Sequence, residues 1–335
     1  MRLAYLLRRL AMALPTLLGV MVVVFVLIRV VPGDPISMMI SGEASPDDIA
    51  KLREAYGLDR SIPVQFLYFL KTVSTGHLGT SISLHQDVLE LIMGRLPATL
   101  ELAILALFFA TVLGVSFALT SVYWRGRWPE VAVDAANALA LALPEFLWAL
   151  LLILLLSVSI PLFPISGRTD PSNAAVFHTQ FYLFESLFTA RFSDFAEILR
   201  HMFLPAISLA LPLTAVIGRV LKSSLLDAIN QDYVLLARAK GFSPLYVLLR
   251  HALPNALIPT ITITGTQFTL LVGGTVLIEL IFAYPGIGNM LFGAAINRDL
   301  PLMQGITIVF AVVFILINIC IDMSYALINP RVRLD

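Results

Sequence analysis

Long runs of hydrophobic residues, separated by shorter polar connections, dominate this sequence. A membrane-spanning helix needs about 20 consecutive apolar residues. Six segments have that length: Leu10 to Val31, Ala98 to Tyr123, Val133 to Ile160, Met202 to Leu221, Ile258 to Phe282 and Leu302 to Ile328. The first is flanked by arginines, as a signal peptide is, but it exceeds the usual apolar region of about 7–15 residues, so we interpret it as a retained span. The pattern predicts an all-α integral membrane protein with six transmembrane helices.

Composition supports this fold class and excludes several functions. Hydrophobic residues make up 59% of the chain and charged residues 13%, whereas soluble domains have roughly 45–50% and about 25%. The formal net charge is zero, which gives no indication of a nucleic-acid partner. The single cysteine, Cys320, excludes an internal disulfide and a thiolate metal cluster.

Basic residues in the short connections predict the orientation, because cytoplasmic loops are enriched in Lys and Arg. With the N-terminus in the cytoplasm, the inner side receives Arg2, Arg8, Arg9, Arg125, Arg127, Lys222, Arg238, Lys240, Arg250, Arg331 and Arg333. Both termini are therefore expected to be cytoplasmic. The predicted parts are 1–31 (N-terminus and first span), 32–97 (extracytoplasmic), 98–160 (spans two and three), 161–201 (extracytoplasmic), 202–221 (span four), 222–257 (cytoplasmic loop), 258–328 (spans five and six) and 329–335 (cytoplasmic tail).

The cytoplasmic loop reads as two helices with a break between them. Asp232 to Lys240 contains good helix formers, and Gly241 suits the left-handed position just past a helix end. Ser243 followed by Pro244 resembles an N-cap and a first-turn proline, which open a second helix running toward Leu253 and Pro254. The spacing places Tyr233, Leu236, Ala237 and Lys240 on one face of the first helix.

We call these two helices and the break between them, residues 232–254, the elbow. Periodicity alone leaves two interpretations of it open. It could lie on lipid headgroups as an amphipathic helix, or it could dock into a groove on a separate protein. The order of the residues favours docking, because Ala237, Gly241, Leu253 and Pro254 have the spacing of the EAA loop of binding-protein-dependent ABC transporter permeases. The run "ARAKG", residues 237–241, resembles the peptide and nickel branch of that family.

Further motifs extend the resemblance over essentially the whole chain. They are "RRLAMALPTLLGV" (8–20), "VPGDP" (31–35), "ELIFAYPGIGNML" (279–291), "RDLPLMQG" (298–305) and "INPRVR" (328–333). The chain is thus similar to permease subunits of peptide-type ABC importers, in particular those of dipeptide permeases. The resemblance implies the type I importer fold, a bacterial inner-membrane location, and import of short peptides by alternating access. Nickel and oligopeptides remain alternative substrates.

The resemblance also implies partners and contact residues. A second, homologous permease, two ATPases carrying ATP and Mg, an extracytoplasmic solute-binding protein and membrane lipid are expected, and a homodimer stays an alternative to the permease pair. No G-x-x-x-x-G-K-[ST] phosphate loop occurs in the chain, so ATP hydrolysis is expected elsewhere and no catalytic residue is assigned. The implied ATPase contacts are Tyr233, Leu236, Ala237, Arg238, Ala239, Lys240 and Gly241, with Ser243, Pro244, Leu253 and Pro254 shaping the loop. Where the general motif begins with Glu, this chain has Leu235 and Leu236, so we expect an apolar contact with Arg238 or Lys240 at its rim.

The two outer segments carry weaker predictions. A Ser-Pro start and periodic apolar residues predict a short surface helix in Ser45 to Asp59; it is either a lid on the bundle or a docking surface for the binding protein. The apolar run Phe177 to Phe188 is expected on the membrane face or, preferably, against a partner.

Charged, small and helix-bending residues occur inside the predicted spans. Glu279, Asp322 and Arg29 lie near span ends and are expected to snorkel or pair, whereas the deeper Glu145 either faces the pathway or makes an interhelical hydrogen bond. Small residues are expected to let helices approach, and prolines to bend spans three and four: Gly114, Gly218, Gly265, Gly273 and Gly274, and Pro144, Pro205 and Pro212. The five histidines lack metal-ligand spacing, so neither a metal site nor a substrate-binding residue is assigned.

Two other function classes are less compatible with the sequence. An ion-coupled symporter usually carries charges deep in several spans and needs no cytoplasmic elbow. An intramembrane enzyme would need a nucleophile beside a base, and no G-x-S-x-G motif occurs in the sequence.

Overall fold

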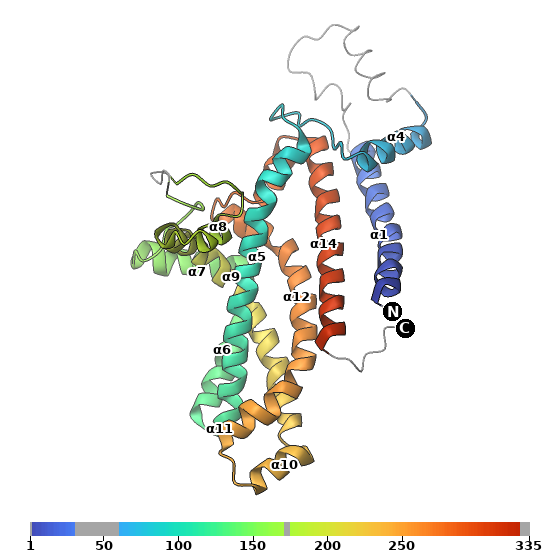
Figure 1. The fold of residues 1–335 in the computed structure, drawn as a ribbon. Coiled ribbons are helices and arrows are strands. Elements are labelled where there is room, and N and C mark those ends of the chain that lie inside the picture. The colour runs from blue at the N-terminus through green and yellow to red at the C-terminus, as the bar shows by residue number, and fades with distance from the viewer. Residues whose placement is uncertain (1, 31–59, 171–174, 329–335) are drawn as a thin grey trace. The chain divides into compact units, whose positions relative to one another are not determined.

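A computed structural model describes residues 2–30, 60–170 and 175–328 of the chain (Figure 1). These residues are almost entirely helical, and the strand-like pairing among them is one bridge between Thr80 and Asp87. The predicted all-α fold is confirmed. The surface helix predicted for residues 45–59 and the cytoplasmic tail lie outside the described residues, as do the side chains of Arg29 and Asp322.

The chain divides into two compact units, the first formed by Met1–Leu96 with Ile287–Leu316. It contains α1 (Arg2–Val30), α4 (Ile62–Ser74), α13 (Ile287–Ile296) and the beginnings of α5 (Val88–Tyr123) and α14 (Leu300–Ile328). Apolar residues from three of these helices, among them Val88, Ile287 and Ile306, form its buried core. Asp299, between α13 and α14, accepts hydrogen bonds from the hydroxyls of Ser81 and Ser83 at 2.5 and 2.7 Å. This carboxylate therefore fixes the loop that precedes α5.

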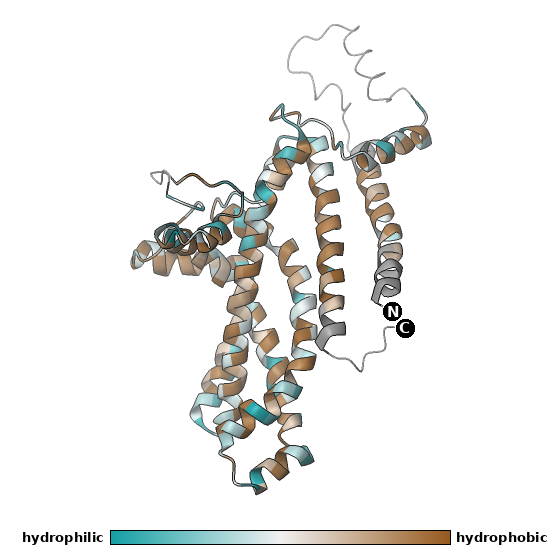
Figure 2. Ribbon diagram, in the orientation of Figure 1, coloured by the Kyte–Doolittle hydropathy of each residue, from teal (hydrophilic) through white to brown (hydrophobic). Residues whose placement is uncertain are grey.

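The second unit, Pro97–Gly286 with Ile317–Asp335, holds most of the helices. In chain order they are α6 (Trp128–Ala142), α7 (Glu145–Ile153), η1 (Leu154–Ser159), α8 (Tyr182–Phe188), α9 (Phe192–Ala228), α10 (Asp232–Ala239), α11 (Pro244–Val247), η2 (Leu248–Ala252) and α12 (Leu253–Ile281). Helix α9 packs along α12, α6 and α7 and is the most buried of them. Figure 2 shows apolar colour along α5, α12 and α14, as spanning helices require.

Four helical stretches of the described residues are long and apolar enough to cross a membrane: Val88–Tyr123, Phe192–Ala228, Pro244–Ile281 and Leu300–Ile321. The third predicted span consists of two helical pieces, α6 and α7 with η1, and the direction of the helix bends by 105° at the break between them. We call them the bent pair. Pro144 stands at this break, as predicted, since proline disfavours a helical conformation in the residue before it. Ala11–Val26 of α1 forms a shorter apolar stretch.

Several predicted boundaries differ from the helices. Helix α5 begins at Val88 and α9 at Phe192, each ten residues before the predicted span, because both helices continue past their apolar centres into polar turns. Pro205 and Pro212 lie inside the continuous α9.

Close helix approach is confirmed at three of the predicted glycines. A Cβ on Gly114 would lie 2.9 Å from Cγ2 of Ile217, and one on Gly218 would lie 3.4 Å from the Gly114 oxygen. Gly265 is tighter still, because a Cβ there would collide with Cγ2 of Ile321 in α14. Gly273 is different: a Cβ added there would have no atom of the described residues within 4 Å, so the expected close packing at this position is wrong.

Candidate functional site: the elbow and the polar cluster at α8

The elbow begins with α10, an eight-residue helix that starts at Asp232 as predicted and ends at Ala239, one residue before the predicted end. Gly241 has a φ of +82°, the left-handed conformation that glycine adopts most easily. Ser243 then accepts a hydrogen bond on Oγ from the Tyr246 amide at 3.4 Å, and Pro244 occupies the first turn of α11. Gly241, the Ser243 cap and Pro244 together turn the chain sharply. The turn separates the first arm of the elbow, α10, from the second arm, which begins with α11.

The inner side of α10 packs against the second arm. Val234 and Ala237 are buried together with Val247 of α11. Ala237 is only 4% exposed, which corrects its predicted place on the outward face: the small side chain holds the two arms together. Its i, i+3 neighbour Val234 was the signal for this inward stripe, because valine lies on the same side of the helix.

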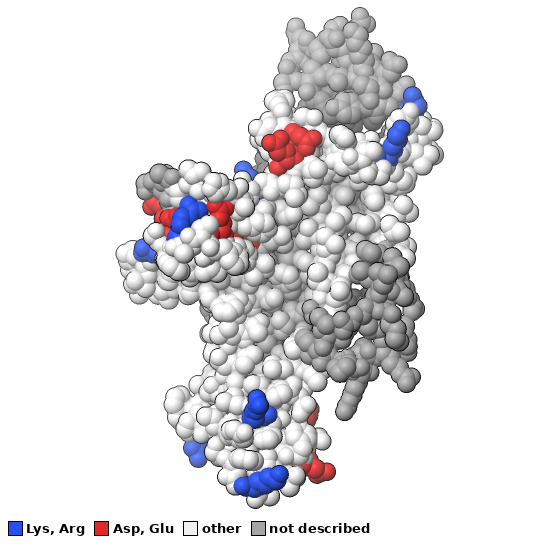
Figure 3. All heavy atoms as spheres, in the orientation of Figure 1, with Lys and Arg blue, Asp and Glu red and all other residues white. Residues whose placement is uncertain are grey.

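The outer side of α10 is apolar and exposed. Tyr233 is 41% exposed and Leu236 is 58% exposed, with Leu235 also open. Arg238, Ala239, Lys240 and Gly241 are exposed around them. The arrangement is an apolar centre with basic residues beside it, and Figure 3 shows charged side chains at this end of the second unit.

The second arm adds exposed residues that the sequence motifs did not assign to the site. They are Phe242, Leu245, Tyr246 and Leu249. Phe242 and Tyr246 also contact the ring of His251, with centroids 5.9 and 5.8 Å apart. Leu245, Tyr246 and Leu249 have the spacing of one helical face, which could have indicated them, whereas Phe242 precedes the cap Ser243.

The second arm does not stop at Leu253 and Pro254, as the sequence suggested. It passes through the π-helical turn η2 directly into α12, so residues 244–281 form one helical stretch. Proline has no amide hydrogen, and the wider turn just before it accommodates Pro254 without ending the helix. The elbow is thereby continuous with the fifth span.

The elbow is also joined firmly to the bundle. Leu248, Ala252 and Ala256 are buried against Val122 of α5 and Leu225 of α9. One turn before Leu225, Lys222 of α9 pairs with two carboxylates of α6. Its Nζ donates to Asp134 Oδ2 at 2.7 Å and lies 2.9 Å from Glu130 Oε1. A force on the elbow would therefore reach α5, α6, α9 and α12 through packed contacts.

A polar groove opens behind the elbow. Ser224, Asp227, Gln231, Tyr233, Asn255 and Pro259 are among the residues that line its volume of ≈ 570 Å³. The Asn255 amide donates to the Tyr233 hydroxyl at 3.0 Å. This bond fixes the orientation of Tyr233 from the start of α12.

A buried polar cluster joins the segment that precedes and includes α8 to the bundle. Arg168 pairs with Glu101 of α5, and its guanidinium lies 3.9 Å from the ring centroid of Tyr182. Glu101 also accepts from the Phe184 amide at 3.1 Å. The predicted apolar run Phe177 to Phe188 thus contains α8, which packs inward through these contacts while Phe188 is 84% exposed.

Glu185 of α8 organises the chain that leads into this helix. It accepts hydrogen bonds from the Thr179 hydroxyl and from the amides of His178 and Thr179, all at 2.7 or 2.8 Å. The hydrogen bond from the Thr179 side chain, followed by that from the His178 amide, lowers the pKa of Glu185 to about 2.

Glu279 confirms the prediction that a carboxylate near a span end would find a partner. It is fully buried and accepts from the Thr99 hydroxyl at 2.7 Å. Glu145, in contrast, lies near α12 without a hydrogen bond to any described residue, and its Oε1 would be 3.4 Å from a Cβ on Gly274.

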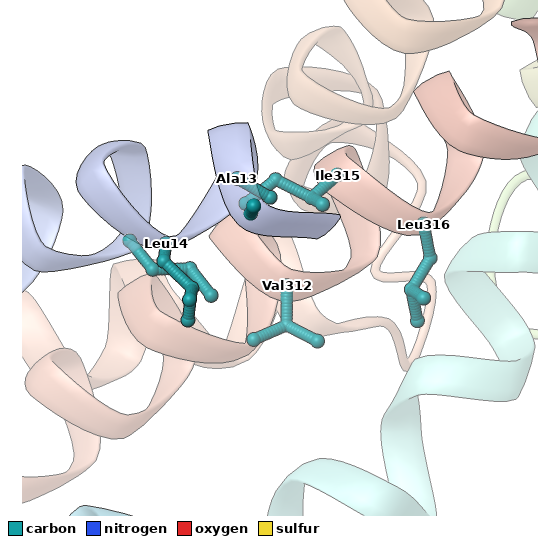
Figure 4. A pocket seen from close by; sticks show the side chains of 7 residues that line it. Ala13, Leu14, Val312, Ile315 and Leu316 are labelled. Atoms are coloured by element: carbon teal, nitrogen blue, oxygen red, sulfur yellow. The ribbon is translucent and has the colours of Figure 1, made fainter. Parts of the chain in front are cut away.

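A second groove, in the first unit, is lined by apolar residues. Ala11, Ala13, Leu14 and Leu17 of α1 face Val312, Ile315 and Leu316 of α14 around ≈ 440 Å³ (Figure 4). It offers no polar group to orient a polar ligand. Within the described part of the chain, no group of three His, Cys, Asp or Glu side chains could hold a metal ion.

Family models match nearly all of the chain. Residues 110–334 match the binding-protein-dependent transport system inner membrane component, and residues 2–103 match the N-terminal part of such a membrane component. The chain belongs to this family of transport permeases. It is accordingly a multi-pass inner-membrane transport subunit.

Relatives of this permease match it from end to end. It is 35% identical to the dipeptide transport system permease protein DppB of Alkalihalophilus pseudofirmus, over 99% of both chains. It is 38% identical to the di/tripeptide permease protein DppB of Pseudomonas aeruginosa and 37% identical to the dipeptide permease protein DppB of Escherichia coli K12, again over 99% of each chain. The resemblance found in the sequence motifs is confirmed.

Solved structures show the same fold. The permease resembles a chain of the MetNI methionine ABC transporter with a TM-score of 0.52 and 17% identity, covering 69% of this permease and 93% of that chain. A second crystal form of MetNI gives a TM-score of 0.53 at 15% identity, covering 71% and 96%. The type I importer fold predicted from the motifs is therefore confirmed.

Proposed function

We propose that this permease forms half of the translocation path of an ATP-driven importer of short peptides, with dipeptides as the leading substrates. The observation that carries the proposal is the match to dipeptide and di/tripeptide permeases over 99% of each chain. Nickel or oligopeptides would be the alternative cargo of the same machine. Dipeptides lead because the relatives matched over their full length are dipeptide and di/tripeptide permeases.

The proposed partners follow from the family's dependence on a binding protein. An extracytoplasmic solute-binding protein delivers the peptide, a second, homologous permease supplies the other half of the path, and two ATPase subunits bind ATP and Mg. Both termini and the elbow lie in the cytoplasm. Exposed Phe188 and its apolar neighbours around α8 are suited to an extracytoplasmic partner.

The elbow is the proposed ATPase contact. Tyr233, Leu235 and Leu236 form an exposed apolar centre at its tip, with Arg238 and Lys240 beside it. Docking removes this apolar surface from water, and the rim charges contribute only modestly. We extend the predicted contact to Phe242, Leu245, Tyr246 and Leu249 of the second arm, because these side chains are exposed on the same elbow.

Alternating access follows from the rigidity of this connection. Closure of the ATPases on ATP would draw the two permeases' elbows together. Because the elbow continues into α12 and packs on α5 and α9, the helices would turn as a body between inward-open and outward-open states. ATP drives this change only through its different affinity for the two states.

The test combines copurification with transport. Tagged permease is purified with its candidate ATPases, and ATP-dependent uptake of a labelled dipeptide is measured in proteoliposomes that contain the full complex. Leu236→Glu is expected to lose both ATPases and uptake, because a carboxylate would be buried in the contact. Trp128→Glu is the matched control, since Trp128 is 80% exposed near the predicted inner side and should keep both.

The opposite outcomes are equally informative. If no ATPase copurifies with the wild-type permease, the importer function is wrong. Peptide uptake driven by a proton gradient without ATP would identify a symporter, and retention of ATPases by Leu236→Glu would favour a lipid-lying elbow.

A further inference from the structure

Glu145 is the first residue of α7, directly after the break in the bent pair α6 and α7. Asp134 of the same bent pair forms an ion pair with Lys222. Lys222 marks the predicted inner edge of the membrane. From Asp134 to the end of α6 at Ala142 the helix rises about 12 Å. The break therefore falls near the middle of a hydrocarbon core about 30 Å thick.

The carboxylate of Glu145 has no hydrogen bond and no ion pair with any residue that the structure describes. Three carboxylates elsewhere in the helices of this unit have polar partners: Glu101 with Arg168, Asp134 with Lys222, and Glu279 with Thr99. An ionised carboxylate at membrane depth is unfavourable without water or a cation. Glu145 therefore needs a polar partner from outside the described chain.

A glycine of α12 lies beside Glu145. A Cβ on Gly274 of α12 would lie 3.4 Å from Glu145 Oε1, and the adjacent Gly273 is exposed with no atom near the position of a side chain. The indole of Trp148 donates to the Ala140 carbonyl at 3.2 Å and so braces α7 against the end of α6. The carboxylate thus lies at a braced break in the helix, against the backbone of Gly274.

We propose that Glu145 binds the α-ammonium group of the transported peptide. An ammonium has three N–H donors, and a carboxylate is its strongest partner among side chains. Every unmodified peptide carries this group at its N-terminus whatever its side chains are. The inference rests on the proposed function, because it takes a peptide as the cargo of this path. A cationic side chain of the second permease is the competing partner.

The experiment uses the complete complex in proteoliposomes, with one binding protein throughout. Uptake of a dipeptide is compared with that of its analogue in which a hydroxyl replaces the α-ammonium. Glu145→Gln is expected to slow dipeptide uptake about tenfold, the effect of losing a charge-assisted hydrogen bond, and to change analogue uptake less than about twofold. Because the binding protein is unchanged, the altered preference belongs to the permease. Glu145→Asp should retain part of the preference, and Glu90→Gln, at an exposed position in the first turn of α5, should retain all of it.

A second measurement tests whether Glu145 faces the path. Cys320, the single cysteine, is replaced by serine, and Glu145→Cys is treated with a cationic, water-soluble thiol reagent. Modification that slows when the complex is supplied with dipeptide supports the proposal. Absence of modification in both the nucleotide-free and the ATP-bound complex would overturn it, because the side chain would then face lipid or the second permease.

The outcomes distinguish the ammonium site from the importer function. Unchanged dipeptide uptake by Glu145→Gln, or an equal loss for dipeptide and analogue, overturns the ammonium site while wild-type uptake leaves the importer function standing. If the wild-type complex takes up no dipeptide, the proposed function fails, and the ammonium site falls with it.

Discussion

Arg168 and Glu101 form an ion pair whose side chains are 5% and 0% exposed. Arg168 comes from the segment before α8 and Glu101 from α5, and Arg168 also donates to the Gln180 carbonyl at 2.8 Å. One guanidinium therefore ties the segment before α8 to a helix long and apolar enough to span the membrane. Because the pair is buried, loss of one partner leaves the other charge without water or counter-ion.

We expect Arg168→Met to destabilise the permease by about 3–5 kcal/mol, since Glu101 would remain buried and unpaired. Thermal unfolding of purified protein in detergent measures the effect. Glu101→Gln combined with Arg168→Met should recover most of the loss, because no unpaired charge remains.

The comparison for this prediction is Arg191→Met. Arg191 pairs with Glu185 at 3.2 Å but is 32% exposed, so its removal should cost less than about 1 kcal/mol. Equal midpoints for Arg168→Met and the wild type would show that the ion pair does not hold the outer segment in place.

Close packing of α12 on α14 predicts a different kind of defect. An added methyl group at Gly265 would collide with Ile321, whose branched side chain cannot rotate away easily. Gly265→Ala should therefore destabilise the protein by about 1–3 kcal/mol. Gly273→Ala in the same helix meets no atom of the described residues and should unfold at the wild-type temperature or slightly above; a loss as large as that of Gly265→Ala would contradict the close packing at Gly265.

Local signals in the sequence predicted much of the fold. Apolar runs predicted the long apolar helices, and Pro144 predicted the break that appears as a 105° bend. Gly241 and Ser243 gave the elbow, because left-handed backbone and N-capping depend on a few neighbouring residues. These features need no knowledge of distant contacts.

Features that depend on distant contacts could not be predicted in this way. Ala237 faces inward because Val247 of the second arm covers it; the i, i+3 pair of Val234 and Ala237 marks an apolar stripe but does not show which residue covers it. Arg168 and Glu101 are 67 residues apart, and nothing local to either residue indicates the other. The helical continuation through Pro254 was missed because proline after a polar segment ordinarily marks a boundary.

The elbow's cap provides a third prediction. Ser243→Ala removes the acceptor of the Tyr246 amide, which should destabilise the start of α11 by about 1 kcal/mol. Hydrogen exchange measured by mass spectrometry should then be faster in residues 244–247. Ser243→Asp supplies another good N-cap and should restore slow exchange; faster exchange in this variant as well would show that the serine acts through something other than its cap.

The depressed pKa of Glu185 predicts a pH response of the outer segment. The Thr179 hydroxyl and the His178 amide stabilise the ionised form and lower the pKa from 4.5 to about 2. The stabilisation is therefore fully present above pH 4.5 and is lost as the pH falls toward 2, because the unfolded segment takes up its proton first. Hydrogen exchange of the His178 and Thr179 amides, corrected for the intrinsic effect of pH, should accelerate over this window in the wild-type protein. Glu185→Gln carries no titrating carboxyl at this position, so its corrected exchange should be faster than that of the wild type at pH 6 and nearly constant down to pH 3. An acceleration of the same size in Glu185→Gln would assign the pH response to another acidic group.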